Sequence, residues 1–219
     1  DGLVGLLVAQ CTHDFRIRAV AQHEAEIPES SSFAALVGSG RLVVTVEASE
    51  RGARYQGIVP LAGDSISNCL EAYFASSEQL PTRLMLASDA GGASGLLMQK
   101  LPESDSGEAS GAVLQGIWEE LQSGLAAVSR DQLQRLPASE LLPAVCGSHD
   151  CRLFSSTPVR FECSCSQQRV GELLRSVGEA EARSVLAEQG SVTITCEFCR
   201  STYRFDAVDI EQLFVSNAS

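Results

Sequence analysis

Four cysteines near the C-terminal end of the chain decide its fold: Cys163-Ser164-Cys165, then thirty intervening residues, then Cys196-Glu197-Phe198-Cys199. Two close pairs of thiols suit a tetrahedral Zn²⁺, because each pair supplies two ligands from one short turn and the intervening segment folds back to join them. The CxxC half is a common zinc knuckle. The CxC half is unusual, since its sulfurs lie close enough to react with each other once the metal leaves. The sequence therefore predicts a zinc site that can also respond to oxidants.

The cysteines lie in a segment, residues 161–219, whose pattern predicts a small unit. Ser166 is placed to cap a helix, and Gly190 stands where a second helix, over 179–189, should end. Alternating apolar residues then predict a hairpin with the CxxC pair at its tip, followed by a helix over about 207–215. With fewer than 60 residues and few aromatic side chains, this unit has a core too small to be secure without its metal.

The whole chain predicts an α+β fold, with an N-terminal α/β sandwich-like domain over 1–109 and a helical linker over 110–160 ahead of the zinc unit. The elements predicted for the first domain are strands at 42–46 and 55–59 with a polar turn between them, a helix over 66–76, a hairpin around the Gly-rich turn 89–95, and a polar loop at 103–110. The chain begins with Asp1-Gly2 and continues at once into an apolar stretch, so we expect the first elements of this domain to be missing.

The linker is predicted to have only modest stability of its own. Apolar spacing predicts an amphipathic helix over 112–128, and a capping box that begins at Ser129 opens a second short helix, which Pro137 ends. Residues 138–160 show little periodicity, and Pro143 is expected to break any helix there. We therefore expect the linker to be metastable.

Composition excludes several classes of function. The formal net charge of −12 argues against binding to nucleic acid or to an anionic membrane, because both interactions draw on basic patches. The longest apolar stretches, such as 4–9, are far too short to span a bilayer. Half of the eight cysteines have metal-site spacing, which indicates a reducing compartment and predicts a cytoplasmic protein. The only lysine, Lys100, follows Gln99, so the Gly-Lys of a phosphate-binding loop is absent.

Several stretches carry a resemblance to a known family. The spacing of residues 163–166 and 196–199 resembles the redox-switch domain of the 33-kilodalton heat-shock chaperones. Upstream, residues 54–57 (Arg-Tyr-Gln-Gly) and 77–83 resemble two stretches of that family's N-terminal domain in the same order, and 92–102 resembles the strand that follows. We predict packing or turn roles for the first two of these upstream stretches. The resemblance covers essentially the whole chain.

The resemblance implies an ATP-independent holdase that is activated by oxidation, and not an enzyme. In the reduced state it implies one Zn²⁺ per chain, held by Cys163, Cys165, Cys196 and Cys199. Oxidation would release the metal, form the disulfides Cys163–Cys165 and Cys196–Cys199, loosen the linker and expose apolar surface to unfolded client proteins. A homodimer on oxidation, and a location in the cytoplasm or an organelle of bacterial descent, also fit the resemblance.

Two other functions are open for the four cysteines. They could form a constitutive zinc-ribbon module for protein interactions with no redox switching, because the spacing by itself predicts metal binding more strongly than switching. A thioredoxin-type oxidoreductase is less consistent with the sequence. In that fold the CxxC pair begins a helix after a strand, whereas here the pair joins two predicted strands.

The remaining cysteines have separate predictions. Cys146 and Cys151 depart from the family pattern, since apolar residues are expected at these linker positions. With His149 they form a candidate for a second metal site, but an auxiliary disulfide is the better prediction. Cys11 and Cys69 fall on apolar faces and are predicted to be small core residues.

Overall fold

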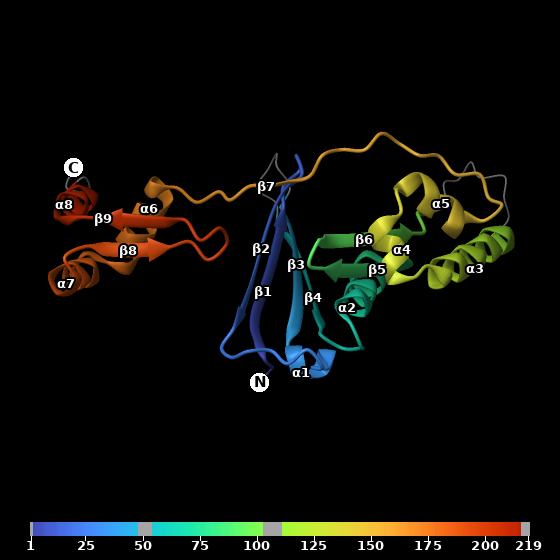
Figure 1. Cartoon of the computed structure of the whole chain (residues 1–219), viewed down its shortest axis with the longest axis horizontal. Helices are drawn as coiled ribbons and strands as arrows, with labels where there is room; N and C mark the ends of the chain where they lie inside the picture. The colour runs from blue at the N-terminus through green and yellow to red at the C-terminus, as the bar shows by residue number, and fades with distance from the viewer. Residues whose placement is uncertain (1, 48–53, 103–110, 216–219) are drawn as a thin grey trace. The chain divides into compact units, whose positions relative to one another are not determined.

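The computed structural model describes residues 2–47, 54–102 and 111–215 and has the mixed α+β fold that the sequence predicts (Figure 1). Its contacts divide the chain into two units, each built from segments that are distant in sequence. The first unit contains Asp1–Gly5 and His23–Ser156, and the second contains Leu6–Gln22 and Thr157–Ser219. Within the described ranges, no helix is long and apolar enough to cross a membrane.

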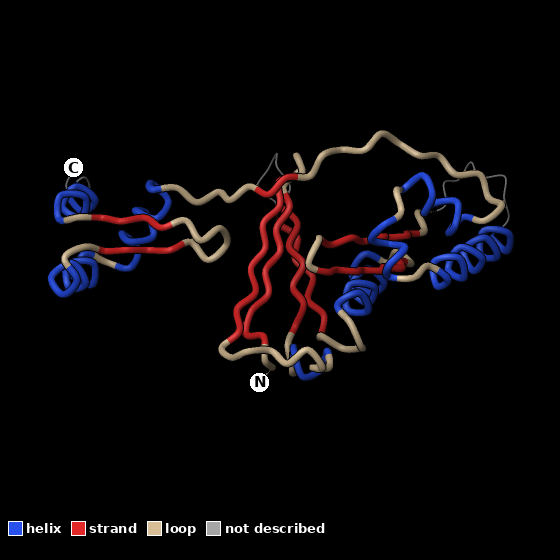
Figure 2. Tube along the Cα trace, in the orientation of Figure 1, coloured by secondary structure: helices blue, strands red, loops and turns tan. Residues whose placement is uncertain are grey.

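The first unit combines helices with two antiparallel hairpins, β3–β4 and β5–β6 (Figure 2). Its elements are α1 (Phe33–Val37), β3 (Arg41–Glu47), β4 (Arg54–Pro60), α2 (Ile66–Tyr73), the π-helical turn η1 (Phe74–Glu78), β5 (Thr82–Asp89), β6 (Gly92–Gln99), α3 (Gly111–Ala127), α4 (Arg130–Arg135) and α5 (Ala138–Cys146). The strands, helix and hairpin predicted between 42 and 98 are confirmed. The turn predicted between β3 and β4 and the loop predicted at 103–110 fall outside the described residues.

The stretch 54–57 has a packing role, as the sequence predicts. Gly57 of β4 is buried against α2, and a Cβ atom at this position would lie 2.4 Å from Cε2 of Tyr73. The Tyr73 hydroxyl donates a hydrogen bond to Glu78 (2.5 Å), and the Tyr55 hydroxyl donates one to the carbonyl of Ser77 (3.3 Å). These contacts hold the β3–β4 hairpin against α2 and η1.

Helices α3, α4 and α5 share one hydrophobic core with the β5–β6 hairpin. The buried members of this core, named here the linker core, are Ala87, Leu125, Val128, Leu133, Leu141 and Val145. Helices α3 and α5 approach closely, since a Cβ atom at Gly124 would lie 2.2 Å from the carbonyl oxygen of Val145. The predicted capping box at Ser129 is present and begins α4.

The expectation that Pro143 breaks any helix in 138–160 is wrong. Helix α5 continues past Pro143 to Cys146 and ends at Gly147, whose φ of +59° suits glycine and whose N–H donates to the Pro143 carbonyl (3.0 Å). Pro143 removes one backbone hydrogen bond of the helix, and its ring crowds the carbonyl of Ser139. Leu141 and Val145, four residues apart on one face, are both buried in the linker core, and this burial outweighs the loss.

The second unit begins with a small sheet. Strands β1 (Val4–Cys11), β2 (Arg16–His23) and β7 (Arg160–Phe161) lie in the order β1-β2-β7, and β7 runs parallel to β2. The Arg160 N–H donates to the carbonyl of Phe15, and the Glu162 N–H donates to the carbonyl of Ile17, both at 3.1 Å. This short pairing leads the chain directly into the first predicted cysteine pair.

The C-terminal part of the second unit follows the sequence prediction closely. Its elements are α6 (Gln167–Val177), α7 (Glu179–Gln189), β8 (Val192–Thr195), β9 (Thr202–Phe205) and α8 (Ala207–Val215). The Ser166 side chain accepts a hydrogen bond from the Arg169 N–H and caps α6, and Gly190 ends α7 with a φ of +73°. The buried members of the core, named here the switch core, are Val170, Leu174, Ala182, Val192, Phe205 and Ile210.

The two cysteines that the sequence predicts to be core residues differ in burial. Cys69 is fully buried in α2, and its thiol donates to the Ala62 carbonyl (3.2 Å). Cys11 is exposed, so the prediction for this residue is wrong. It lies at the end of β1, where the chain turns at Thr12, and it belongs to neither the linker core nor the switch core.

Candidate metal centre

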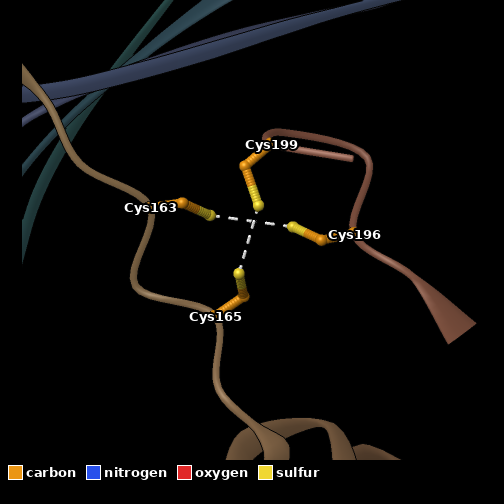
Figure 3. Close-up of side chains that lie close together, drawn as sticks. All are labelled: Cys163, Cys165, Cys196 and Cys199. Atoms are coloured by element: carbon orange, nitrogen blue, oxygen red, sulfur yellow. Dashed lines mark hydrogen bonds between the residues drawn. The ribbon is translucent and has the colours of Figure 1, made fainter. Parts of the chain in front are cut away.

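Two loops carry the four-cysteine cluster, which comprises Cys163, Cys165, Cys196 and Cys199 (Figure 3). The first two residues lie between β7 and α6, and the last two lie in the turn between β8 and β9. The four Sγ atoms all lie within 4.8 Å of one another. Figure 3 shows the side chains pointing toward a common centre, so the fold brings together the two pairs that the sequence singles out.

The sulfur separations suit a tetrahedral ion. Cys163 Sγ lies 3.7 Å from Cys196 Sγ, and Cys165 Sγ lies 3.3 Å from Cys199 Sγ. Four ligands about 2.3 Å from a tetrahedral Zn²⁺ would lie about 3.8 Å from each other. Thiolates are also the soft ligands that Zn²⁺ accepts and that Mg²⁺ and Ca²⁺ do not prefer. The donor set therefore fits Zn²⁺.

Backbone hydrogen bonds shape the CxxC turn. The Cys196 N–H donates to the Ser201 carbonyl, and the Arg200 N–H donates to the Cys196 carbonyl, both at 2.8 Å. Arg200 has a φ of +60°, a left-handed conformation that is uncommon for a residue with a side chain. This conformation lets the chain reverse directly after Cys199, so that both thiols of the turn face the other pair.

Three polar side chains contact the cluster from outside. The Tyr203 hydroxyl donates to Cys165 Sγ at 3.0 Å, and the Cys199 thiol donates to the Ser201 hydroxyl at 3.3 Å. Nη1 of Arg18 lies 3.8 Å from Cys163 Sγ. The sequence predicts Tyr203 only as a strand residue. It gives no signal for Arg18, which belongs to no motif and lies 145 residues from Cys163.

The thiols of the cluster differ in acidity. Once ionised, the Cys199 sulfur accepts hydrogen bonds from the side chain and backbone of Ser201, and these lower its pKa to about 6. The Tyr203 hydroxyl lowers the pKa of Cys165, but neighbouring sulfurs, first Cys199, and burial outweigh it and raise that pKa to about 12. Burial opposes ionisation of Cys163, yet hydrogen bonds led by the Cys165 backbone lower its pKa. Four thiolates at these distances repel one another, and a divalent cation removes that repulsion.

Two sulfur contacts at hydrogen-bond distance join the halves of the cluster. They connect Cys163 with Cys196 and Cys165 with Cys199, whereas the resemblance implies disulfides within each pair. In a tetrahedral cluster every sulfur has three near neighbours, so the reduced geometry does not select one pairing. The disulfide pairing stays a prediction.

The linker residues do not form a second metal site. Cys146, His149 and Cys151 are not among the groups that the described residues bring within metal-binding distance. His149 Nε2 instead lies 2.7 Å from a carboxylate oxygen of Glu120 on α3. Burial, and then the neighbouring Cys151, raise the pKa of the Cys146 thiol. An auxiliary disulfide between these two free cysteines stays a prediction.

Nearly all of the chain is similar in sequence to one family of known proteins. A sequence model of the family described as "Hsp33 protein" matches residues 1–206. A 33 kDa chaperonin from Methylobacillus flagellatus is 39% identical over 98% of this chain and 71% of its own length. A 33 kDa chaperonin from Ectopseudomonas mendocina is 40% identical over 100% of this chain and 74% of its own length. These relatives are named as chaperonins and not as enzymes.

The fold also matches a solved structure. The crystal structure of the 33 kDa chaperonin from Thermotoga maritima superposes with a TM-score of 0.79 over 97% of this chain and 74% of that chain, at 22% sequence identity. The match supports the same α+β architecture. Because the family model spans nearly the whole chain and the relatives are closely similar over their shared length, the resemblance first seen in the cysteine spacing is confirmed, and the chain belongs to the Hsp33 family of chaperones.

Proposed function

We propose that the chain is an ATP-independent holdase that oxidation of the four-cysteine cluster activates. The observation that carries the proposal is the approach of four sulfur atoms to within 4.8 Å at the junction of β7, α6 and the β8–β9 turn. A change in the bonding of these sulfurs alters the connection between these elements. The membership of the chain in a chaperone family supports binding of unfolded proteins rather than turnover of a substrate.

In the reduced state, Cys163, Cys165, Cys196 and Cys199 hold one Zn²⁺ per chain. When bound, Zn²⁺ supplies a cross-link between the CxC loop and the CxxC turn, and its binding free energy contributes to folding, at roughly 10–16 kcal/mol in zinc-finger peptides. Tyr203 holds the Cys165 sulfur in place through its hydroxyl. The switch core is built from α6, α7, α8 and the hairpin, and none of its buried members lies in the CxC loop or the CxxC turn. The two loops therefore depend on the cluster for their order.

Oxidation replaces this cross-link with bonds inside each loop. Two thiols lose two protons and two electrons to one molecule of hydrogen peroxide, which is reduced to two molecules of water, and one disulfide forms. We assign the pairs Cys163–Cys165 and Cys196–Cys199. Each disulfide then lies within one loop, so nothing covalent joins the CxC loop to the CxxC turn.

Loosening of the small unit then frees apolar surface for clients. We assign residues 161–219 to the redox switch, 110–160 to a metastable linker and 1–109 to client binding. The apolar surface that becomes available is the linker core, in which side chains of α3, α4 and α5 pack against the β5–β6 hairpin of residues 1–109 in the reduced state. Unfolded proteins expose the same kind of surface, and its burial drives the association.

The central experiment measures metal and activity on one sample. Zinc content is determined before and after hydrogen peroxide, and suppression of the aggregation of a thermally unfolded client is followed in parallel. We expect about one zinc per chain when reduced, loss of zinc with gain of activity, and reversal by a dithiol reductant. Zinc that stays bound under peroxide, with no gain of activity, would support a constitutive zinc-ribbon interaction module instead.

Tryptic digestion tests the disulfide pairing directly. Cleavage at arginine places Cys163 and Cys165 on the peptide 161–169 and places Cys196 and Cys199 on the peptide 184–200. The proposed pairing leaves two separate peptides, each lighter by two hydrogens. A covalent link between the two peptides would show instead that the near neighbours of the reduced cluster pair with each other.

We also infer a cytoplasmic location, or an organelle of bacterial descent, and a homodimer on oxidation. The location is supported by the metal-site spacing of four of the eight cysteines, since thiols stay free to bind metal in reducing compartments. Size-exclusion chromatography of reduced and oxidised protein tests the dimer. A single monomeric peak in both states would contradict it.

A further inference from the structure

Arg18 of β2 reaches the four-cysteine cluster from a distant part of the sequence. Its Nη1 donates to the Ser164 hydroxyl at 2.8 Å and lies 3.8 Å from Cys163 Sγ. Its guanidinium carbon lies 4.3 Å from the centre of the Phe198 ring. Ser164 lies between the cysteines of the CxC loop, and Phe198 lies between those of the CxxC turn. One half-buried side chain therefore contacts both halves of the cluster.

The position of Arg18 is fixed from the other side. Its Nε donates to the Gln10 side chain at 2.6 Å, across from β1. The backbone before the CxC loop is paired with β2 by the hydrogen bond from Glu162 to Ile17, and the Glu162 carboxylate accepts from Arg16 at 2.7 Å. These contacts set the distance between β2 and the loop, so the guanidinium is held in place.

A second contact joins β2 to the CxxC turn. The amide of Gln22 donates a hydrogen bond to the carboxylate of Glu197, which adjoins Phe198. Strand β2 therefore lies along both loops, with Arg18 at the cluster and Gln22 at the edge of the turn. All of these residues belong to the second unit.

The chemistry of these contacts suits a metal-bound cluster. Four thiolates and one Zn²⁺ leave an excess of two negative charges, which a neighbouring cation stabilises. A guanidinium can donate in its plane and stack on an aromatic ring through its face at the same time. A lysine ammonium has no such plane, so it cannot make both contacts in the same way.

We infer that Arg18 is a positioning residue of the cluster, which clamps the CxC loop to the CxxC turn and ties both to strand β2. This inference rests on the proposed zinc site. The clamp slows the loss of metal during oxidation. It also transmits that loss to the β2–β7 pairing, because the opened turn takes Phe198 away from Arg18 and removes one side-chain contact that holds this part of the chain. The contacts that remain on the short strand β7 include the backbone hydrogen bonds to β2 and the ion pairs Arg16–Glu162 and Arg160–Asp14.

The test compares Arg18→Met, Arg18→Lys and a control, Arg183→Met. Arg183 is an arginine of the same unit whose guanidinium pairs with Glu179 on α7 instead of with the cluster. Zinc content is measured on the reduced proteins, and release under peroxide is followed with a chromogenic chelator. We expect about one zinc in all four proteins and roughly five-fold faster release from Arg18→Met. Arg18→Lys should fall between Arg18→Met and the wild type, and Arg183→Met should match the wild type.

Amide hydrogen exchange provides a readout that does not depend on chaperone activity. In the wild type, protection of the Arg160 and Glu162 amides should fall when zinc is removed, and in Arg18→Met it should already be reduced with zinc bound. Equal release rates for wild type and Arg18→Met at equal zinc content would overturn the inference, as would equal acceleration in Arg183→Met. If Arg18→Lys releases zinc at the wild-type rate, a positive charge alone accounts for the effect, and the clamp is overturned. A wild type without zinc would refute the proposed function itself.

Discussion

The linker core and the switch core each contain six buried hydrophobic residues, but they differ in what surrounds them. The linker core is enclosed by helices that approach closely at Gly124 and by the β5–β6 hairpin. The switch core lies at one end of its hairpin, and the CxC loop and CxxC turn extend beyond it. Apolar burial therefore explains the order of the linker helices, whereas the order of the two loops needs the cross-link at the cysteines.

The largest expected effect comes from removing one ligand. Cys196→Ser should lower zinc affinity strongly and leave residues 161–219 disordered even when reduced, because three thiolates do not close the tetrahedral site. The linker core should also loosen, though less, because the proposed function couples its order to that of the small unit. Amide hydrogen exchange, compared between α6 and α3, measures both effects in one experiment.

The control for this variant is Cys11→Ser, which replaces an exposed thiol outside the cluster and should leave zinc content and exchange unchanged. If Cys196→Ser keeps full zinc, the ligand assignment is wrong. If it loses zinc while the amides of α6 and α7 stay protected, the six buried residues of the switch core keep these helices folded without metal. The two cores would then differ less in their need for a cross-link than we propose.

The second prediction disrupts the linker core without touching the cluster. In Gly124→Ala the new methyl group would meet the Val145 carbonyl, so α3 and α5 must separate, and we expect a loss of about 1–3 kcal/mol in the free energy of unfolding. Zinc content should stay near one per chain. Denaturant unfolding followed by tryptophan fluorescence measures the loss, since Trp118 lies on α3 and is buried.

Gly116→Ala is the matched control on the same helix. A Cβ atom at Gly116 has nothing within 4 Å, so alanine should stabilise α3 by about 0.5–1 kcal/mol through its higher helix propensity. Opposite signs for the two substitutions would support the close helix approach. A neutral or stabilising Gly124→Ala would contradict it.

The same comparison explains what the sequence can predict. Elements α6, α7, β8 and β9 follow from local signals, such as the cap at Ser166, the stop at Gly190 and strict strand alternation, and α7 has the bounds that the sequence predicts. Helix α5 does not follow from such signals, because Pro143 is a strong local indication against it, and only the burial of Leu141 and Val145 against other elements overrides that indication. Local pattern carries no information about such distant partners.

The residues of the candidate site likewise divide into those that local sequence predicts and those that it does not. The spacing of the cysteines is local within each pair, so the sequence alone is enough to predict the cluster. It is not enough for Arg18, because the role of this residue depends on the parallel pairing of β2 with a two-residue strand that has no sequence signature. The exposure of Cys11 escapes prediction for a related reason, since an apolar face in sequence does not show whether anything packs on it.

A third prediction concerns the support of one ligand. Tyr203→Phe removes the hydroxyl that donates to Cys165 Sγ at 3.0 Å, and we expect zinc affinity to fall roughly ten-fold with the hairpin still folded. Competition with a chromogenic chelator measures the affinity. Tyr55→Phe is the matched control, because its hydroxyl bonds to Ser77 in the first unit, and it should leave zinc affinity unchanged. Equal affinities for Tyr203→Phe and the wild type would show that the hydroxyl does not support the ligand.

The smallest effect is expected at the linker cysteines. Replacing both Cys146 and Cys151 with Val should leave zinc content near one per chain, because four thiolates already complete a tetrahedral site. Cys146 is half-buried and Cys151 is exposed, so the change in the free energy of unfolding should stay within about 1 kcal/mol. Oxidant activation should persist, with a modest change in rate if an auxiliary disulfide normally forms.

The tryptic digest gives this last prediction a direct check. In the wild type both linker cysteines fall on the peptide 136–152, and an oxidation-induced disulfide makes that peptide lighter by two hydrogens. Such a bond would close a loop directly after α5, the helix that covers the linker core, and so could alter how fast the linker loosens. Loss of activation in the double variant, at unchanged zinc content, would place the linker cysteines in the switch mechanism and would mean that both units, and not only the second, respond to oxidants through sulfur chemistry.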